Sequence, residues 1–142
     1  MTLATGYILQ DALQNRYAIP AFSVHSNDMI DAVLDEAELA QHPVLLQIGQ
    51  RAIRNGQMKS LTDYIRYRAG VLTIPVVIHL DHSHLYSQVV QALRTGLTSC
   101  MIDASALKFD DNIAVTKSVV ELCHSVGIPR SIRSLCACFF VS

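Results

Sequence analysis

Apolar residues in this chain gather in short runs that alternate with longer stretches of helical spacing. The short, mostly apolar runs lie at 18–24, 44–48, 76–80 and 98–102. Such runs are typical of buried strands, and apolar residues that recur every three to four positions are typical of amphipathic helices. The pattern predicts an opening helix followed by four strand–helix units, each of roughly 20–30 residues, as parallel βαβ crossovers require.

Two architectures fit this alternation: a doubly wound sheet and part of a (β/α)8 barrel. No Gly-x-Gly-x-x-Gly segment follows the first predicted strand, so the main positive evidence for a nucleotide-binding sheet is missing. A complete barrel needs about 250 residues, and this chain has 142. The expected fold class is therefore α/β, as a partial TIM (β/α)8 barrel with an opening helix and about four β/α units.

The third predicted strand, 76–82, ends in the pair Asp81-His82. Side chains alternate along a strand, so His79 and Asp81 share one face, and His82 is expected as the first residue beyond the strand. The fourth predicted strand ends in a second carboxylate, Asp103. Because functional groups collect at the carboxyl ends of parallel strands, Asp81, His82 and Asp103 are expected to converge on one rim.

An imidazole beside carboxylates suits a divalent metal such as zinc, and a carboxylate can also transfer protons. The pair Asp81-His82 is on its own more typical of a surface ion pair and a solvated histidine. Its position at the end of an apolar strand favours a catalytic or metal site.

Two further expectations concern loops and caps. A polar loop is expected around Gly49, followed by a helix that starts near Ser60. Asp110 or Asp111 is expected to cap the last helix, since aspartate is a preferred N-cap residue.

Composition narrows the classes of function. The formal net charge is −1, which gives no electrostatic case for nucleic acid or an anionic membrane surface. No apolar segment approaches the ~20 residues of a membrane span, and the first residues lack a signal-peptide pattern. A cytoplasmic protein is the expectation.

Cys100 and Cys123 are expected as small core residues, and Cys136 and Cys138 are too closely spaced for a zinc knuckle.

The last stretch, 130–142, does not continue the unit pattern. It begins with basic and polar residues and ends in a short apolar block. We interpret 1–129 as one domain and 130–142 as a tail unrelated to it, such as a frameshift or truncation would leave. The alternative is an ordinary edge strand at Leu135–Val141.

Four segments resemble the class II, zinc-dependent fructose- and tagatose-bisphosphate aldolases, in matching order and spacing over roughly 5–129. They are Tyr17–His25, Pro43–Gln47, His79–His82 (His-Leu-Asp-His) and Met101–Ser105 (Met-Ile-Asp-Ala-Ser) with Asn112-Ile113. The chain thus resembles the N-terminal half of that family.

The resemblance implies a TIM barrel that reversibly cleaves fructose- or tagatose-1,6-bisphosphate to dihydroxyacetone phosphate and glyceraldehyde 3-phosphate. It implies Asp81 as the group that exchanges a proton with the C4 hydroxyl, His82 as a ligand of catalytic zinc, and Asp103 as a carboxylate for a second metal position. Ser23 stands where the family usually has a substrate-contacting Asn, and Gly49 where it often has a small hydroxyl residue. The family is commonly homo-oligomeric.

The family's Glu-Leu-Gly segment, two further zinc histidines and phosphate site have no counterpart in this sequence. The leading hypothesis is therefore an aldolase by descent that is inactive as this chain alone. The alternatives are a non-catalytic half-barrel or partner-binding module, and another α/β metal enzyme that completes its site with a partner's ligands.

Overall fold

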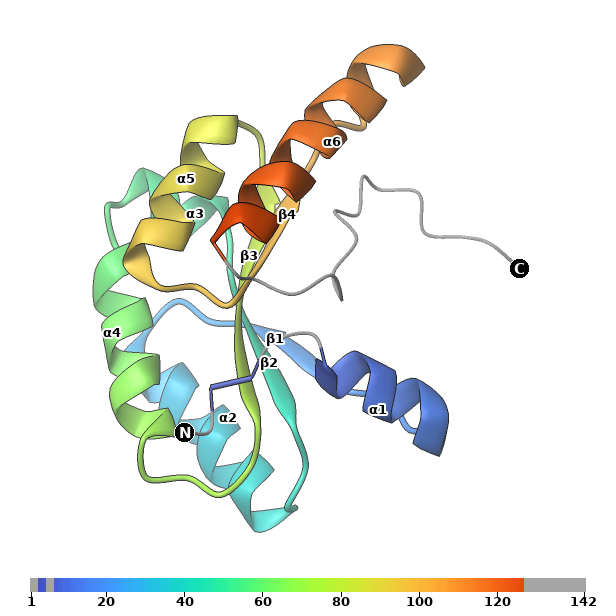
Figure 1. The fold of residues 1–142 in the computed structure, drawn as a ribbon. Coiled ribbons are helices and arrows are strands. Elements are labelled where there is room, and N and C mark those ends of the chain that lie inside the picture. The colour runs from blue at the N-terminus through green and yellow to red at the C-terminus, as the bar shows by residue number, and fades with distance from the viewer. Residues whose placement is uncertain (1–2, 5–6, 127–142) are drawn as a thin grey trace.

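The computed structural model describes residues 3–4 and 7–126. Within them, four parallel strands form one sheet in the order β1-β2-β3-β4, with helices between the strands (Figure 1). The elements in chain order are α1 (Tyr7–Asn15), β1 (Ala21–Ser23), α2 (Asn27–Leu39), β2 (Val44–Ile48), α3 (Gln50–Arg54), α4 (Met58–Ala69), β3 (Val76–Ser83), α5 (Tyr86–Thr95), β4 (Ser99–Ile102) and α6 (Phe109–Ser125). The predicted α/β class and the sequential order of parallel strands are confirmed.

The two faces of the sheet differ in their cover. Helices α2, α4 and α5 lie on one face and α1 on the other (Figure 1). The main core fills the helix-covered face and includes Ile30, Leu34, Leu46, Ile48, Ile65, Ile78, Leu80 and Val89. A smaller cluster of Ala4, Ile8 and Val77 covers part of the opposite face. Because side chains alternate along β3, His79 and Asp81 share this second face with Val77, which would be the inside of a barrel.

Local sequence signals explain the ends of two helices. Ser26 is the N-cap of α2, and its Oγ accepts a hydrogen bond from the Met29 N–H at 3.3 Å. Gly96 ends α5 with φ 97°, a left-handed conformation that glycine adopts without a Cβ penalty. Ser26 thus starts α2 shortly after β1, and Gly96 ends α5 shortly before β4.

Two local expectations are wrong. The predicted loop after Gly49 contains the short helix α3, which forms because Ala52 packs into the core on one side of it. The N-cap of α6 is Lys108, and Asp110 and Asp111 both lie in its first turn. There the helix dipole stabilises their negative charge without a capping bond.

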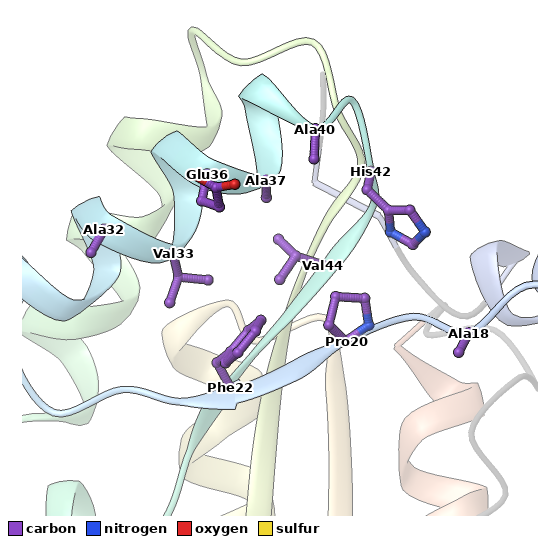
Figure 2. Close-up of a pocket in the computed structure, with 10 residues that line it drawn as sticks. All are labelled: Ala18, Pro20, Phe22, Ala32, Val33, Glu36, Ala37, Ala40, His42 and Val44. Atoms are coloured by element: carbon purple, nitrogen blue, oxygen red, sulfur yellow. The ribbon is translucent and has the colours of Figure 1, made fainter.

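An apolar groove of about 490 Å³ lies between α2 and β1, at the β1 edge of the sheet. Its walls are Ala18, Pro20, Phe22, Ala32, Val33, Glu36, Ala37, Ala40, His42 and Val44. Figure 2 shows the side chains of Phe22, Val33 and Val44 pointing toward the same space. Phe22 is 46% exposed, and β1 is an edge strand of the sheet. Among the described residues, no strand pairs with the outer edge of β1, and the groove adjoins that edge.

No helix in the described part of the chain combines the length and the apolar character needed to span a membrane. The predicted tail at 130–142 lies outside the described residues.

Candidate active-site rim

Asp81, His82 and Asp103 come together at the carboxyl ends of β3 and β4. His82 Nδ1 lies 3.1 Å from Asp103 Oδ2, and His82 Nε2 lies 3.9 Å from Asp81 Oδ1. The imidazole therefore stands between the two carboxylates. The three side chains that were expected on one rim do lie on one rim.

His82 does not leave the sheet, so the expectation that it follows the strand is wrong. The strand β3 continues to Ser83, which pairs with Ile102 across a register shift after Leu80. The Asp103 N–H donates to the Ser83 carbonyl at 2.7 Å, which holds the end of the strand in the sheet. His82 thus lies in a bulge, a device that redirects side chains next to functional sites.

The bulge places the backbone of His82 in the left-handed region, with φ 48°. For a residue with a Cβ this conformation is uncommon and must be held by its surroundings. The Gln50 side chain stabilises this conformation, because its Nε2 donates a hydrogen bond to the His82 carbonyl at 2.7 Å. Gln50 lies at the start of α3, so this short helix supports the rim.

Gln88 connects this support to α5. Its Oε1 accepts hydrogen bonds from the Gln50 side chain at 3.0 Å and from the backbone N–H groups of His84 and Leu85 at 2.8 and 3.2 Å. We call Gln50 and Gln88 the amide clasp. It joins the first residues of α3, the turn after β3 and the start of α5, and so fixes the segment that carries His82.

Asp103 is held in its ionised form. It accepts hydrogen bonds from the Ser105 hydroxyl at 2.6 Å and the Ser105 N–H at 3.1 Å. These bonds, together with the contact to His82, lower the pKa of Asp103 to about 2. The hydrogen bond to Asp103 in turn raises the pKa of His82 above its usual value. The pair therefore favours an imidazole whose Nδ1–H donates to Asp103 and whose Nε2 faces Asp81.

Asp81 is partly exposed, and its side chain keeps 19% of its accessible surface. Gln47 Nε2 donates to Asp81 Oδ1 at 3.4 Å, which is a long hydrogen bond. A Cβ at Gly49 would lie 4.0 Å from Asp81 Oδ2, an ordinary contact distance. Asp81 is therefore oriented from one side and open to solvent on the other, as a group that exchanges protons with a ligand must be.

Beneath the rim, His79 forms a buried layer with Ser99. Its Nδ1 and the Ser99 hydroxyl form a hydrogen bond, and only 7% of His79 is exposed. Burial lowers the pKa of His79 to about 4, although the negative charge of Asp81 acts in the opposite direction. A neutral His79 therefore forms the floor under the charged groups.

Ser23, the predicted substrate-binding residue, ends β1 at the same end of the sheet. It is in register with Gln47, whose side chain reaches Asp81, and it is exposed. Ser23 thus lies on the rim, two strands away from β3. Gln47, Gln50 and Gln88 are not among the predicted site residues, although a glutamine near the end of an apolar strand is a signal that points to Gln47.

The donors at this rim are of the type that zinc uses, but they are few. Within residues 3–4 and 7–126, no group of three His, Cys, Asp or Glu side chains is placed to hold a metal ion. His82 offers Nε2, because its Nδ1 is engaged with Asp103. A catalytic zinc normally has three protein ligands, so these residues alone do not form its site.

Comparison with known proteins identifies relatives over most of the chain. A family model described as "Fructose-bisphosphate aldolase class-II" matches residues 4–129. A fructose-bisphosphate aldolase of Thermus caldophilus is 39% identical over 127 residues, which are 89% of this chain and 41% of that protein. A sulfofructosephosphate aldolase of Alkalicoccus urumqiensis is 34% identical over 121 residues, which are 85% of this chain and 42% of that protein.

A solved structure shows the same similarity in three dimensions. The crystal structure of the YdjI aldolase from Escherichia coli K12 superposes with a TM-score of 0.84 at 34% identity, over 91% of this chain and 50% of that one. The sheet and helices described above therefore correspond to part of an aldolase TIM barrel. The chain spans about two fifths of the length of the curated relatives it matches.

Proposed function

Because this chain belongs to the class II fructose-bisphosphate aldolase family, we propose that it carries the proton-transfer part of an aldolase active site. The whole reaction would be the reversible cleavage of a phosphorylated ketose, such as fructose- or tagatose-1,6-bisphosphate, to dihydroxyacetone phosphate and glyceraldehyde 3-phosphate. The observation that supports this best is the convergence of Asp81, His82 and Asp103 on one rim. We assign residues 1–129 to the aldolase part and leave 130–142 as an unrelated tail.

Asp81 is proposed as the group that exchanges a proton with the substrate C4 hydroxyl. Its carboxylate is oriented by Gln47 and remains accessible on its other side. A general base needs hydrogen-bond reach to the proton it takes, and the open side of Asp81 provides that space.

His82 is proposed as a zinc ligand through Nε2. Asp103 accepts from Nδ1–H, which fixes the tautomer and the direction of the ring. This contact supports an orienting role for Asp103, beside the metal-binding role that the family resemblance implies. When bound, zinc supplies a Lewis acid that polarises the ketose carbonyl. Ser23 is proposed to contact substrate from β1.

We propose that the chain alone has no measurable aldolase activity. No group of three His, Cys, Asp or Glu side chains among the described residues is placed to hold a metal ion, so zinc would bind weakly and stay hydrated. Orienting the reactants can account for about 7–11 kcal/mol of a barrier, and the family's phosphate site has no counterpart in the sequence.

The test is a coupled assay on purified, monodisperse chain with fructose- and tagatose-1,6-bisphosphate, with and without zinc. We expect no turnover above the background measured with the Asp81→Ala variant. Zinc-dependent, chelator-sensitive cleavage that disappears in Asp81→Ala would contradict the proposed inactivity and would support the role of Asp81.

A second candidate function is a half-barrel that binds another half-barrel. The apolar groove beside the free edge of β1 favours it. All four strands are parallel, so the β4 edge of a second copy can lie beside β1 in the orientation that a barrel requires. A chain that lacks turnover but forms stable dimers would support this candidate, and a chain that stays monomeric would contradict it.

A further inference from the structure

Two buried thiols meet at the junction of β4 and α6, away from the rim. Cys100 lies in the middle of β4, and Cys123 lies in the last turn of α6, 23 positions later. Their Sγ atoms are 3.2 Å apart, and both residues are free thiols. One thiol donates a hydrogen bond to the other across this short distance.

The two cysteines belong to the helix-covered face of the sheet. Both are members of the main core, where Val119 of the same helix is also buried. Cys100 is 5% exposed and Cys123 is 9% exposed. A sulfur–sulfur bond is about 2.05 Å long, so the sulfurs need to approach by only about 1 Å, which a small shift of α6 provides.

We propose that Cys100 and Cys123 form an oxidation site, in which a hydroperoxide converts the two thiols into an intramolecular disulfide between β4 and α6. The oxidation site is independent of the proposed aldolase function, because it includes neither the rim residues nor a substrate. The oxidant is a hydroperoxide, and hydrogen peroxide is the simplest member of that class.

The reaction has two steps. In the first, the Cys123 thiolate attacks one peroxide oxygen, the O–O bond breaks, and the other oxygen leaves as water after taking up a proton. Cys123 is then a sulfenic acid. In the second, the Cys100 sulfur attacks the Cys123 sulfur, the S–O bond breaks, and the hydroxyl leaves as water with the Cys100 proton. Two thiols are oxidised by the loss of two hydrogens, and one peroxide is reduced to two waters.

Cys123 is the thiol that reacts first. It is two residues from the end of α6, followed by the exposed residues His124 and Ser125. Helix ends open locally at low free-energy cost, so a small oxidant reaches Cys123 before Cys100 in the strand. The contact with Cys100 also lowers the pKa of Cys123, while the same contact and burial raise the pKa of Cys100. The thiolate therefore forms on Cys123, where the oxidant arrives.

The disulfide would connect α6 covalently to the strand that leads into Asp103. Helix α6 otherwise reaches the sheet mainly through side-chain packing, with Val119 and Cys123 as its buried residues. Fixing its last turn to β4 restricts the unfolded chain and the opening of this helix. The oxidised chain should therefore melt at a temperature several degrees higher than the reduced chain.

The experiment uses the full chain with Cys136 and Cys138 replaced, as C136S/C138S, so that only the proposed pair remains. After treatment with hydrogen peroxide, we expect a mass decrease of two hydrogens, loss of both alkylatable thiols, a higher melting temperature, and full reversal by dithiothreitol. Peptide mapping of the unsubstituted chain tests for the Cys100–Cys123 link without relying on the folding of that variant.

Single variants in the same background separate the two roles. We expect C136S/C138S/C100S to accumulate a sulfenic acid on Cys123 that dimedone traps, and C136S/C138S/C123S to give little dimedone product. Disulfides only between chains, or oxidation of both thiols to sulfinic acids without a link, would overturn the proposal. Thiols that stay fully alkylatable after peroxide treatment would overturn it as well.

Discussion

At the scale of single residues, the site depends on a backbone conformation that its own residue does not favour. His82 has φ 48°, and the amide clasp holds its carbonyl through Gln50. We expect Gln50→Ala to lower the free energy of unfolding by about 1 kcal/mol, the typical net value of one hydrogen bond. It should also shift and broaden the NMR signals of the His82 ring. Gln91→Ala, on the exposed side of α5, is the matched control; equal effects in both variants would contradict this role of Gln50.

A second residue-scale prediction concerns His79, whose pKa of about 4 lies below its ordinary value of 6.5. Between these values the unfolded chain binds a proton that the folded chain does not, so stability rises with pH over this window. His79 should therefore contribute on the order of 3 kcal/mol above pH 6.5, lost as pH falls to 4. Asp81 and His82 are the charged groups that face it.

The measurement is urea unfolding from pH 4 to 7.5 with wild type, His79→Gln and the exposed control His84→Gln. We expect His79→Gln to flatten the pH dependence and His84→Gln to leave it unchanged. The prediction is wrong if all three proteins show the same slope.

The sequence predicts the residues that carry charge at the rim but misses those that position them. Asp81, His82 and Asp103 each stand at the end of a recognisable strand. Gln50 holds a backbone carbonyl 32 positions away, and no local pattern encodes such a contact. The bulge at His82 likewise depends on pairing with β4, which becomes known only when the strands are assembled.

At the scale of elements, the ends of α5 show which local signals survive packing. Gly96 lies just beyond this helix and has φ 97°. A Cβ at this position would meet Arg66 Nη1 at 2.7 Å, although the guanidinium can move aside. We expect Gly96→Ala to lower the free energy of unfolding by about 1–2 kcal/mol, because alanine disfavours the left-handed backbone conformation. Gly70→Ala, at φ −64°, carries no such backbone penalty, although its Cβ would lie 3.2 Å from the Tyr67 carbonyl oxygen. It should lower the free energy of unfolding by less, and thermal unfolding of both variants measures the difference.

Where element predictions fail, tertiary contacts override the local pattern. The segment after Gly49 is polar, yet it forms α3 because burial of Ala52 stabilises one turn that polarity alone does not favour. Helix α6 begins after Lys108, whose side chain makes no capping hydrogen bond, and the two aspartates lie inside its first turn. Periodic apolar segments are predicted well because their burial is what selects the helix.

At the scale of the whole molecule, the sheet formed by residues 3–4 and 7–126 has two strand edges where a closed barrel has none. The alternation of strands and helices predicts this half-barrel because each unit repeats the same pattern, and the length of the chain limits the number of units. What covers the edges cannot be predicted from the same pattern, since apolar periodicity identifies a buried face but not the surface that packs against it.

The last prediction concerns these uncovered surfaces. Phe22 lies on β1, in the groove between α2 and β1, and is 46% exposed. Unpaired strand edges beside apolar surface favour association. We therefore expect the chain to self-associate as its concentration rises, with β4 of one copy beside β1 of another. Phe22→Asp should shift the equilibrium toward monomer, because a carboxylate in the contact would lose its hydration without gaining a partner.

Phe109→Asp is the matched control, because Phe109 is 78% exposed but lies at the start of α6, outside the groove. Sedimentation velocity over a concentration series measures the association, and circular dichroism verifies that both variants remain folded. A wild-type chain that stays monomeric throughout would contradict the prediction. Equal loss of association in the two variants would show that exposed aromatic area in general, and not the groove beside β1, drives the contact.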